Sequence, residues 1–178
     1  MNQTSDLTER TLSREEKYQG SFLSLHVDQV QLPNGRTSIR EVVEHVDGVA
    51  ILALDDRNNV LTVTQYRYVI GKPLLEIPAG KLEPGEDPVA GALRELKEET
   101  GAVPDTFLPM GVTLPSPGCL SERLYLFLAK GLHMEEQHLD EDEFLNVERI
   151  PFSEMVHRVM DGEIEDGKTI AAVLKAKV

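Results

Sequence analysis

Acidic side chains are crowded into residues 80–102, which read GKLEPGEDPVAGALRELKEETGA. Glu95, Glu98 and Glu99 are three and four residues apart, so on a helix they share one patch. Like charges at this spacing repel, and Arg94, four residues before Glu98, can neutralise only part of the cluster. A hard divalent cation with oxygen ligands would supply the missing charge. The ordinary alternative is a solvated acidic helix face.

The same segment carries the signals of a helix over about residues 88–100. Asp87 is a good N-cap, Pro88 suits the first helical position, and Gly101 can end the helix in a left-handed conformation. We expect the three glutamates to lie on a face apart from the buried stripe. That predicted stripe, spaced at i, i+3, i+4 and i+7, consists of Val89, Ala92, Leu93 and Leu96.

The offsets of this segment match, position for position, the Nudix box, G-x5-E-x7-R-E-U-x-E-E-x-G-U, in which U is apolar. A solvated acidic face would leave Gly80, Glu86, Arg94 and Gly101 unexplained at these offsets. The sequence therefore resembles the Nudix hydrolases. The resemblance implies a loop-helix-loop that holds magnesium, or manganese in its place, against the diphosphate of a nucleoside diphosphate linked to another group.

The resemblance also assigns roles within the box. Glu86 is more often an outer or structural member, and Arg94 pairs with a box carboxylate, most often Glu98, and keeps it ionised. Glu98 either binds metal or orients water. The implied metal ligands are the carboxylates of Glu95, Glu99 and Glu98 and the backbone carbonyl of Ala79.

Two further stretches resemble the ADP-ribose pyrophosphatase branch of that family. One joins Gln65-Tyr66-Arg67 to Glu76-Ile77-Pro78-Ala79-Gly80, and the other is Ser116-Pro117-Gly118, with Pro117 sixteen residues after Gly101. We expect Pro117 and Gly118 to lie at the substrate. The resemblance implies hydrolysis of ADP-ribose to AMP and ribose 5-phosphate. Two alternatives stay open: a broader set of sugar nucleotides such as ADP-glucose and GDP-mannose, and a sensor that binds ADP-ribose without cleaving it.

Several side chains outside the box are candidate substrate contacts. Arg67, at a strand end in an acidic protein, could bind a phosphate or the terminal ribose, although a lone arginine is often a surface cation. Arg40 could reach substrate across a dimer interface. Glu76 could contact ribose or a metal-bound water, or belong only to the loop scaffold. We expect Tyr66 to pack in the core.

An acidic run at residues 139–143, LDEDE, follows a predicted strand. Four acids on a loop are ordinary solubilising surface. In similar enzymes, however, a glutamate on this loop is the general base, which moves in when substrate and metal are bound. By position, Glu141 is the first candidate for that base and Glu143 the second.

Composition narrows the possible partners. The 178-residue chain has a formal net charge of −13 and a sequence pI near 4.8, which disfavours nucleic acid and anionic membranes as partners. Bound divalent metal would reconcile this acidity with a pyrophosphate substrate. The single cysteine, Cys119, excludes an internal disulfide, and the N-terminus lacks an apolar signal region. We expect a cytoplasmic enzyme.

The predicted fold is α/β: a Nudix-type α/β/α sandwich with a mixed sheet over residues 49–178, preceded by an antiparallel β subdomain over 1–48. Residues 1 to about 17 read as a loosely held arm, and Pro33-Asn34-Gly35 joins strands at 22–32 and 37–45, with a bulge near Asp28. Two strands cannot bury a face alone, so this subdomain is the expected homodimerisation element. The remaining expected strands cover 49–54, 60–66, 74–77, 124–129 and 144–150, and the remaining helices run from an N-cap at Ser153 to 160 and over 168–176.

Overall fold

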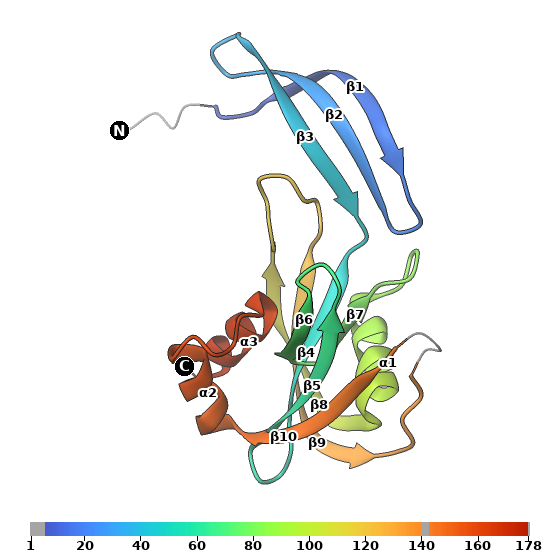
Figure 1. Cartoon of the computed structure of the whole chain (residues 1–178), viewed down its shortest axis with the longest axis vertical. Helices are drawn as coiled ribbons and strands as arrows, with labels where there is room; N and C mark the ends of the chain where they lie inside the picture. The colour runs from blue at the N-terminus through green and yellow to red at the C-terminus, as the bar shows by residue number, and fades with distance from the viewer. Residues whose placement is uncertain (1–5, 140–142, 178) are drawn as a thin grey trace. The chain divides into compact units, whose positions relative to one another are not determined.

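The computed structural model describes residues 6–139 and 143–177, which form two compact units (Figure 1). The N-terminal unit comprises the chain up to Val46 together with Ser116–Glu122. The core unit comprises Asp47–Pro115 and the chain from Arg123 onward. The acidic segment at 80–102 therefore belongs wholly to the core unit.

The core unit is built on a seven-stranded sheet with the order β10-β5-β4-β9-β8, in which β6 pairs with β5 and β7 pairs with β4. The pairing of β4 with β9 is parallel and the other pairings are antiparallel, so the sheet is mixed, as predicted. The strands are β4 (Gly48–Leu54), β5 (Asn59–Arg67), β6 (Lys72–Glu76), β7 (Ala79–Lys81), β8 (Ala102–Thr113), β9 (Leu124–Met134) and β10 (Leu145–Pro151).

Helices cover both faces of this sheet (Figure 1). All seven residues of β4 are buried, and its alternate side chains pack in two separate apolar clusters. Val49, Ile51 and Ala53 pack with α1 (Pro88–Thr100), whereas the other face packs with α2 (Phe152–Met160) and α3 (Gly167–Lys177). The predicted α/β/α sandwich is confirmed. None of the helices in the described part of the chain has the length and apolar character needed to cross a membrane.

The N-terminal unit contains one antiparallel sheet of β1 (Arg10–Gln19), β2 (Leu23–Gln31) and β3 (Thr37–His45) in that order. The predicted hairpin around Gly35 is present. The expectation of a loose arm is wrong from Arg10 onward, because that segment is a third strand. All ten residues of β1 are exposed, so it shows no alternation of apolar residues, and its backbone pairing with β2 makes it a strand.

The expected bulge near Asp28 is also wrong. Strand β2 pairs with β3 without any shift of register, and the irregularities lie in β1, between Thr11 and Ser13 and between Glu16 and Tyr18. The apparent change of phase in β2 arises because His26 and Asp28 are buried, on the same face as Val30. His26 and Asp28 thus occupy buried positions of β2 at which the sequence pattern leads one to expect apolar residues.

Strand β8 was not expected from the sequence, because it contains Pro104, Pro109 and Gly111. It lies at the edge of the sheet, where a missing N–H group need not interrupt the ladder. Its register with β9 shifts between Pro109 and Gly111. The edge position therefore explains how prolines are accommodated in a 12-residue strand.

Helix α1 has the predicted bounds and caps. Asp87 accepts hydrogen bonds from the backbone N–H groups of Val89 and Ala90, and Gly101 is left-handed with φ of 71°. The predicted stripe is wrong in part, since Val89 and Leu93 are 44 % and 36 % exposed. The buried positions are Gly91, Ala92, Glu95, Leu96, Glu99 and Thr100.

At the C-terminal end, α2 begins at Phe152 after Pro151 and has no side-chain cap. The predicted capping role of Ser153 is therefore wrong, because this residue lies inside the helix. The predicted last helix is present as α3.

Candidate active site

Two glutamates of α1 are buried against the chain segment that precedes the helix. A Cβ atom on Gly80 would overlap the carboxyl group of Glu95, so any larger residue here would displace that carboxylate. Glu99 accepts a hydrogen bond of 3.0 Å from the backbone N–H of Ala79. Glu95 and Glu99 are 8 % and 2 % exposed. They lie three and seven residues after Ala92, on the buried side of α1, and not on a separate face as expected. This position brings both carboxylates to residues 79–80.

Arg94 bridges the remaining carboxylates of the segment. Its Nε and Nη2 atoms donate to the two oxygens of Glu86 at 2.9 and 3.0 Å. Its Nη1 atom donates to both Glu95 and Glu98 at 2.9 Å. The expected pairing with Glu98 is present, but Glu86 is the more extensive partner. Glu86 also accepts from the N–H of Glu83, so it ties the loop before the helix to Arg94 of α1.

The electrostatics divide these carboxyl groups into two kinds. Hydrogen bonds from Arg94 and from the Glu83 N–H lower the pKa of Glu86 to about 2, and Glu86 in turn raises the pKa of Arg94. Burial raises the pKa of Glu95, and Arg94 offsets this only in part. Burial also raises the pKa of Glu99 to about 8; the Ala79 N–H opposes that rise, while the charges of Glu95 and Glu143 add to it. Glu95 thus shares Arg94 with Glu86 and Glu98, and Glu99 has a backbone N–H rather than a cation as its hydrogen-bond donor.

This donor set suits a hard cation. Carboxylate oxygens are the ligands that Mg²⁺ and Mn²⁺ prefer, and a divalent ion would favour the ionised forms that burial disfavours. Among residues 6–139 and 143–177, no group of three or more His, Cys, Asp or Glu side chains is gathered closely enough to hold a metal. The carboxylates instead accept hydrogen bonds from Arg94 and from the Ala79 N–H. The residue types therefore fit a hard metal ion, although in this structure their partners are groups of the chain itself.

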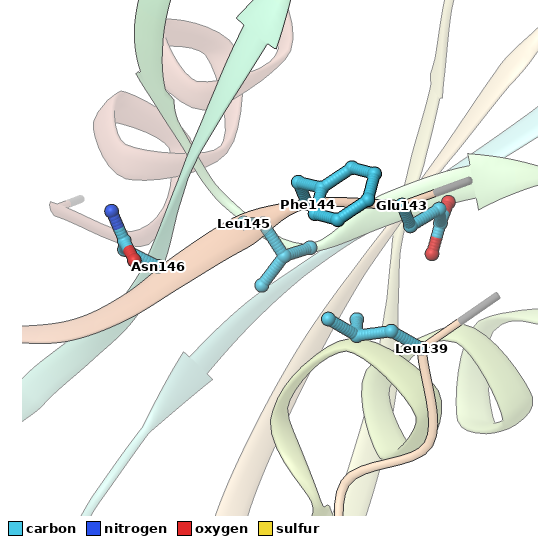
Figure 2. A pocket seen from close by; sticks show the side chains of 5 residues that line it. All are labelled: Leu139, Glu143, Phe144, Leu145 and Asn146. Atoms are coloured by element: carbon cyan, nitrogen blue, oxygen red, sulfur yellow. The ribbon is translucent and has the colours of Figure 1, made fainter. Parts of the chain in front are cut away.

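A pocket lies beside the start of strand β10 (Figure 2). Leu139 forms one wall, and the opposite wall includes Glu143, Phe144 and Leu145. Glu143 is half-buried, and its negative charge helps to raise the pKa of both Glu95 and Glu99. Glu143 is therefore electrostatically coupled to the buried carboxylates. The first candidate for the general base, Glu141, lies outside the described residues.

Glu76 is the centre of a second buried ionic network. Its side chain is 1 % exposed and accepts two hydrogen bonds of 2.7 Å from Nε and Nη2 of Arg67. Lys168, from the first turn of α3, makes an ion pair with the same carboxylate. Burial opposes ionisation of Glu76, but Arg67 and Lys168 outweigh it and lower its pKa. The structure therefore places Arg67 and Glu76 together and adds Lys168.

The other candidate substrate residues belong to the N-terminal unit. Arg40 lies on β3 and donates to Glu9 through Nε at 2.9 Å and Nη2 at 2.5 Å. Pro117 and Gly118 are exposed in a loop whose backbone pairs with Val43 of β3. The structure thus groups these residues with β3 and groups the box, Arg67 and Glu76 in the core unit.

Comparison with known families agrees with this geometry. The NUDIX domain model matches residues 44–173, which is more than half of the chain. This chain belongs to the Nudix family. A second model, the nucleoside diphosphate sugar hydrolase N-terminal domain, matches residues 9–43, which contain β1, β2 and most of β3.

Individual relatives of this Nudix protein align over nearly the full chain. It is 42 % identical over 167 residues to a methanol dehydrogenase activator of Bacillus methanolicus, covering 93 % of this chain and 90 % of the relative. It is 40 % identical over 169 residues to an ADP-ribose pyrophosphatase of Bacillus subtilis strain 168, covering 94 % and 91 %. A crystal structure of an ADP compounds hydrolase superposes with a TM-score of 0.85 at 21 % identity, covering 98 % and 95 % of the two chains. The last similarity shows the fold.

Sequence reasoning missed one member of the Nudix site region and misplaced another residue. Lys168 lies 92 positions after Glu76, and no local pattern joins them. The only available signal was a general one. Glu76 ends an apolar strand, and a buried carboxylate requires a cation, which can be more than one residue. Tyr66 was expected in the core but is 57 % exposed, because Gln65-Tyr66-Arg67 lies at the end of β5, where the strand leaves the packed layers.

Proposed function

We propose that this Nudix protein hydrolyses the diphosphate of ADP-ribose, giving AMP and ribose 5-phosphate, with Mg²⁺ as the metal and Mn²⁺ as a substitute. The observation that carries the proposal is the pair of buried carboxylates, Glu95 and Glu99, which are held against Gly80 and Ala79 and are served only by a shared Arg94 and a backbone N–H. The relative named as an ADP-ribose pyrophosphatase supports the choice of substrate.

We assign the following roles in the reaction to residues of the chain. The carboxylates of Glu95, Glu98 and Glu99 and the carbonyl of Ala79 would hold the metal, which when bound neutralises diphosphate charge and lowers the pKa of water. A water oxygen attacks one phosphorus, the bridging P–O bond breaks, and each product retains one phosphate. Glu141, Glu143 or a box glutamate takes the proton of the attacking water. Arg94 keeps the box carboxylates oriented through its bonds to Glu86, Glu95 and Glu98.

Substrate contacts follow from the remaining donors. Arg67 uses Nε and Nη2 on Glu76, so Nη1 is the group we assign to a substrate phosphate or ribose. Glu76 is almost fully buried, which favours the scaffold role over direct ribose contact. Pro117 and Gly118 would border the substrate, and Arg40 would have to leave Glu9 to reach it from a partner subunit.

We further propose that the protein is a homodimer assembled through the N-terminal unit. Exposed apolar side chains on and beside its sheet include Leu12 at 51 %, Phe22 at 46 % and Ile39 at 63 %. These side chains are left uncovered in the single chain, so a second copy is the natural cover. Light scattering on a sizing column should give twice the chain mass of 19.8 kDa.

A broader substrate range is the second candidate function. The family model over residues 9–43 is named for nucleoside diphosphate sugar hydrolases in general, which keeps ADP-glucose and GDP-mannose as candidates. A non-catalytic ADP-ribose sensor is less favoured, because the full set of box glutamates is present and two are held in place by burial.

The test is incubation of purified protein with ADP-ribose, ADP-glucose and GDP-mannose plus Mg²⁺, followed by separation of products. Glu99→Gln removes one buried carboxylate and should abolish turnover. Glu135→Gln is the matched control, since Glu135 is an exposed carboxylate paired with Lys97 beside the end of the same helix. AMP and ribose 5-phosphate from wild type and from Glu135→Gln alone would support the proposal. Tight binding of ADP-ribose without product would move the protein to the sensor class.

A further inference from the structure

The junction of β6 and β7 spans residues 76–79, of which only 77 and 78 are irregular, and each of the four positions has a partner. The N–H of Ala79 donates to Glu99 at 3.0 Å, and the carbonyl of Pro78 accepts from Ile51 at 2.9 Å. The N–H of Ile77 donates to the Thr169 hydroxyl at 2.9 Å, and the Glu76 carboxylate pairs with Lys168. No regular ladder holds residues 77 and 78, so these partners, together with the pairing of Ala79 with Ala50 of β4, determine where Ala79 presents its N–H to Glu99.

Two of those partners come from the first turn of α3, and that turn is itself braced. Asp166 accepts from the N–H and the hydroxyl of Thr169 at 3.0 and 2.5 Å. Its other oxygen accepts from the Lys168 ammonium at 3.0 Å. Thr169 is fully buried, and the Lys168 side chain is only 12 % exposed. Lys168 and Thr169 are therefore held in one arrangement before they meet residues 76–79.

We propose that Lys168 and Thr169 are positioning residues for the Nudix reaction, because they fix the Glu76–Ala79 segment that orients Glu99. Lys168 acts through Glu76: its ammonium is engaged by two carboxylates, Glu76 and Asp166, and a carboxylate as buried as Glu76 requires paired charge to stay in place. Thr169 acts through the N–H of Ile77. The effect on turnover rests on the proposed hydrolase function, whereas the effect on the segment's geometry does not.

The expected consequence is a loss of turnover without a loss of binding. Removing a group that supports a ligand of the reaction site typically costs about 10- to 100-fold in activity. A shift of the segment would misplace Glu99 in the bound and free enzyme alike, so kcat should fall about 10- to 100-fold while KM stays near the wild-type value.

The first experiment measures the segment directly, without metal or substrate. Amide hydrogen exchange is followed by NMR at Ile77 and Ala79 in wild type, Thr169→Val and Lys168→Met. Thr169→Val should make exchange at Ile77 about tenfold faster, because it removes the acceptor. Lys168→Met should speed exchange at Ala79. Thr169→Ser and Lys168→Arg, which restore the hydroxyl and the charge, should return both rates toward wild type and serve if the first pair folds poorly.

The matched control is Lys72→Met. Lys72 forms an exposed ion pair with Glu165 that also joins β6 to the segment before α3, but it does not contact Glu76. This variant should leave exchange at Ile77 and Ala79, and kcat, unchanged. Equal acceleration in Lys72→Met would show a general loosening of α3 and would overturn the proposal.

The second experiment separates kcat from KM for ADP-ribose hydrolysis in the same variants. A fall in kcat with steady KM in Lys168→Met, rescued by Lys168→Arg, supports positioning. A raised KM with unchanged kcat would make Lys168 a direct substrate contact and overturn the proposal. Unchanged exchange at both amides would overturn it as well. If the wild type cleaves no sugar nucleotide, the proposed function fails, and the exchange rates still decide whether α3 positions the segment.

Discussion

Two carboxylate clusters in this protein are each organised by an arginine, and they differ in how well their charge is balanced. In the N-terminal unit, Arg14 donates to both oxygens of Asp28 and to Glu44. Hydrogen bonds from Arg14 lower the pKa of Asp28 and of Glu44. His26, buried between the same two carboxylates, completes the cluster.

The cluster on α1 has more acid for its arginine. Arg94 serves Glu86, Glu95 and Glu98, and Glu99 has a backbone N–H as its hydrogen-bond donor. The pKa falls at Glu86, which takes two bonds from Arg94, and rises at Glu95 and Glu99, which are buried. The comparison teaches that the ratio of cations to buried carboxylates separates a self-sufficient structural cluster from one that suits an added cation.

Neutralising one carboxylate in each cluster should give the largest contrast. Glu99→Gln should lower kcat by about two orders of magnitude or more, because a preorganised electrostatic group is lost at the reacting centre. Glu44→Gln, in the balanced cluster, should leave kcat unchanged. The comparison is measured as initial rates with ADP-ribose and Mg²⁺ at saturating substrate. Comparable losses of kcat in both variants would mean that the balance of charge does not identify which cluster takes part in catalysis.

Removing the arginine of α1 should destabilise the fold strongly. Arg94→Met leaves Glu86, Glu95 and Glu98 without their shared partner, and we expect a loss of about 2 kcal/mol in the free energy of unfolding, in the range for partly buried hydrogen bonds to charged groups. Urea denaturation of metal-free protein measures this loss. Lys97→Met, which breaks an exposed pair on the same helix, should cost far less. Equal losses in the two variants would contradict the central role of Arg94.

The raised pKa of Glu99 predicts a pH dependence in the metal-free protein. The folded pKa of about 8 exceeds the ordinary value of 4.5, so between these pH values the folded state holds more protons than the unfolded state. The free energy of unfolding should therefore fall as pH rises through this window, by up to about 1.4 kcal/mol per pH unit, and level off above it.

Glu99→Gln should remove that fall, since its amide carries no proton to lose. Urea midpoints of metal-free protein at acid and alkaline pH provide the measurement. The variant should gain stability relative to wild type on the alkaline side of the window and not on the acid side. A wild-type stability that does not decline toward alkaline pH would contradict the assignment of an undercompensated Glu99.

The balanced cluster should show the opposite pH dependence and the smallest effect. Arg14 lowers the folded pKa of Asp28 below 3.8, so the stabilisation is present above that value and is lost as pH falls through the folded pKa. Arg14→Met should lower the melting temperature modestly at neutral pH and leave kcat unchanged. In thermal melts the difference from wild type should shrink as the solution is acidified, and a difference that persists in acid would exclude ionised Asp28 as its source.

The elements that sequence predicted well are those with strong local signals. Asp87, Pro88 and Gly101 bound α1 as expected, and the expected strand at 49–54 coincides with most of β4, which is apolar throughout. Strand β1 and strand β8 were missed because neither shows an apolar period: β1 is exposed along its whole length and β8 is an edge strand with prolines. For both strands, backbone pairing rather than side-chain pattern defines the element.

The candidate site divides along the same line. By itself the sequence determined the family, the box residues and the helix that carries them, because these depend on residue types at fixed short offsets. Only the tertiary structure decided that Glu95 and Glu99 are buried beside Gly80, that Arg94 holds Glu86 most firmly, and that Lys168 meets Glu76 from the far end of the chain. Burial and charge balance depend on which distant segments pack together, and the spacing of residue types along the sequence does not specify those contacts.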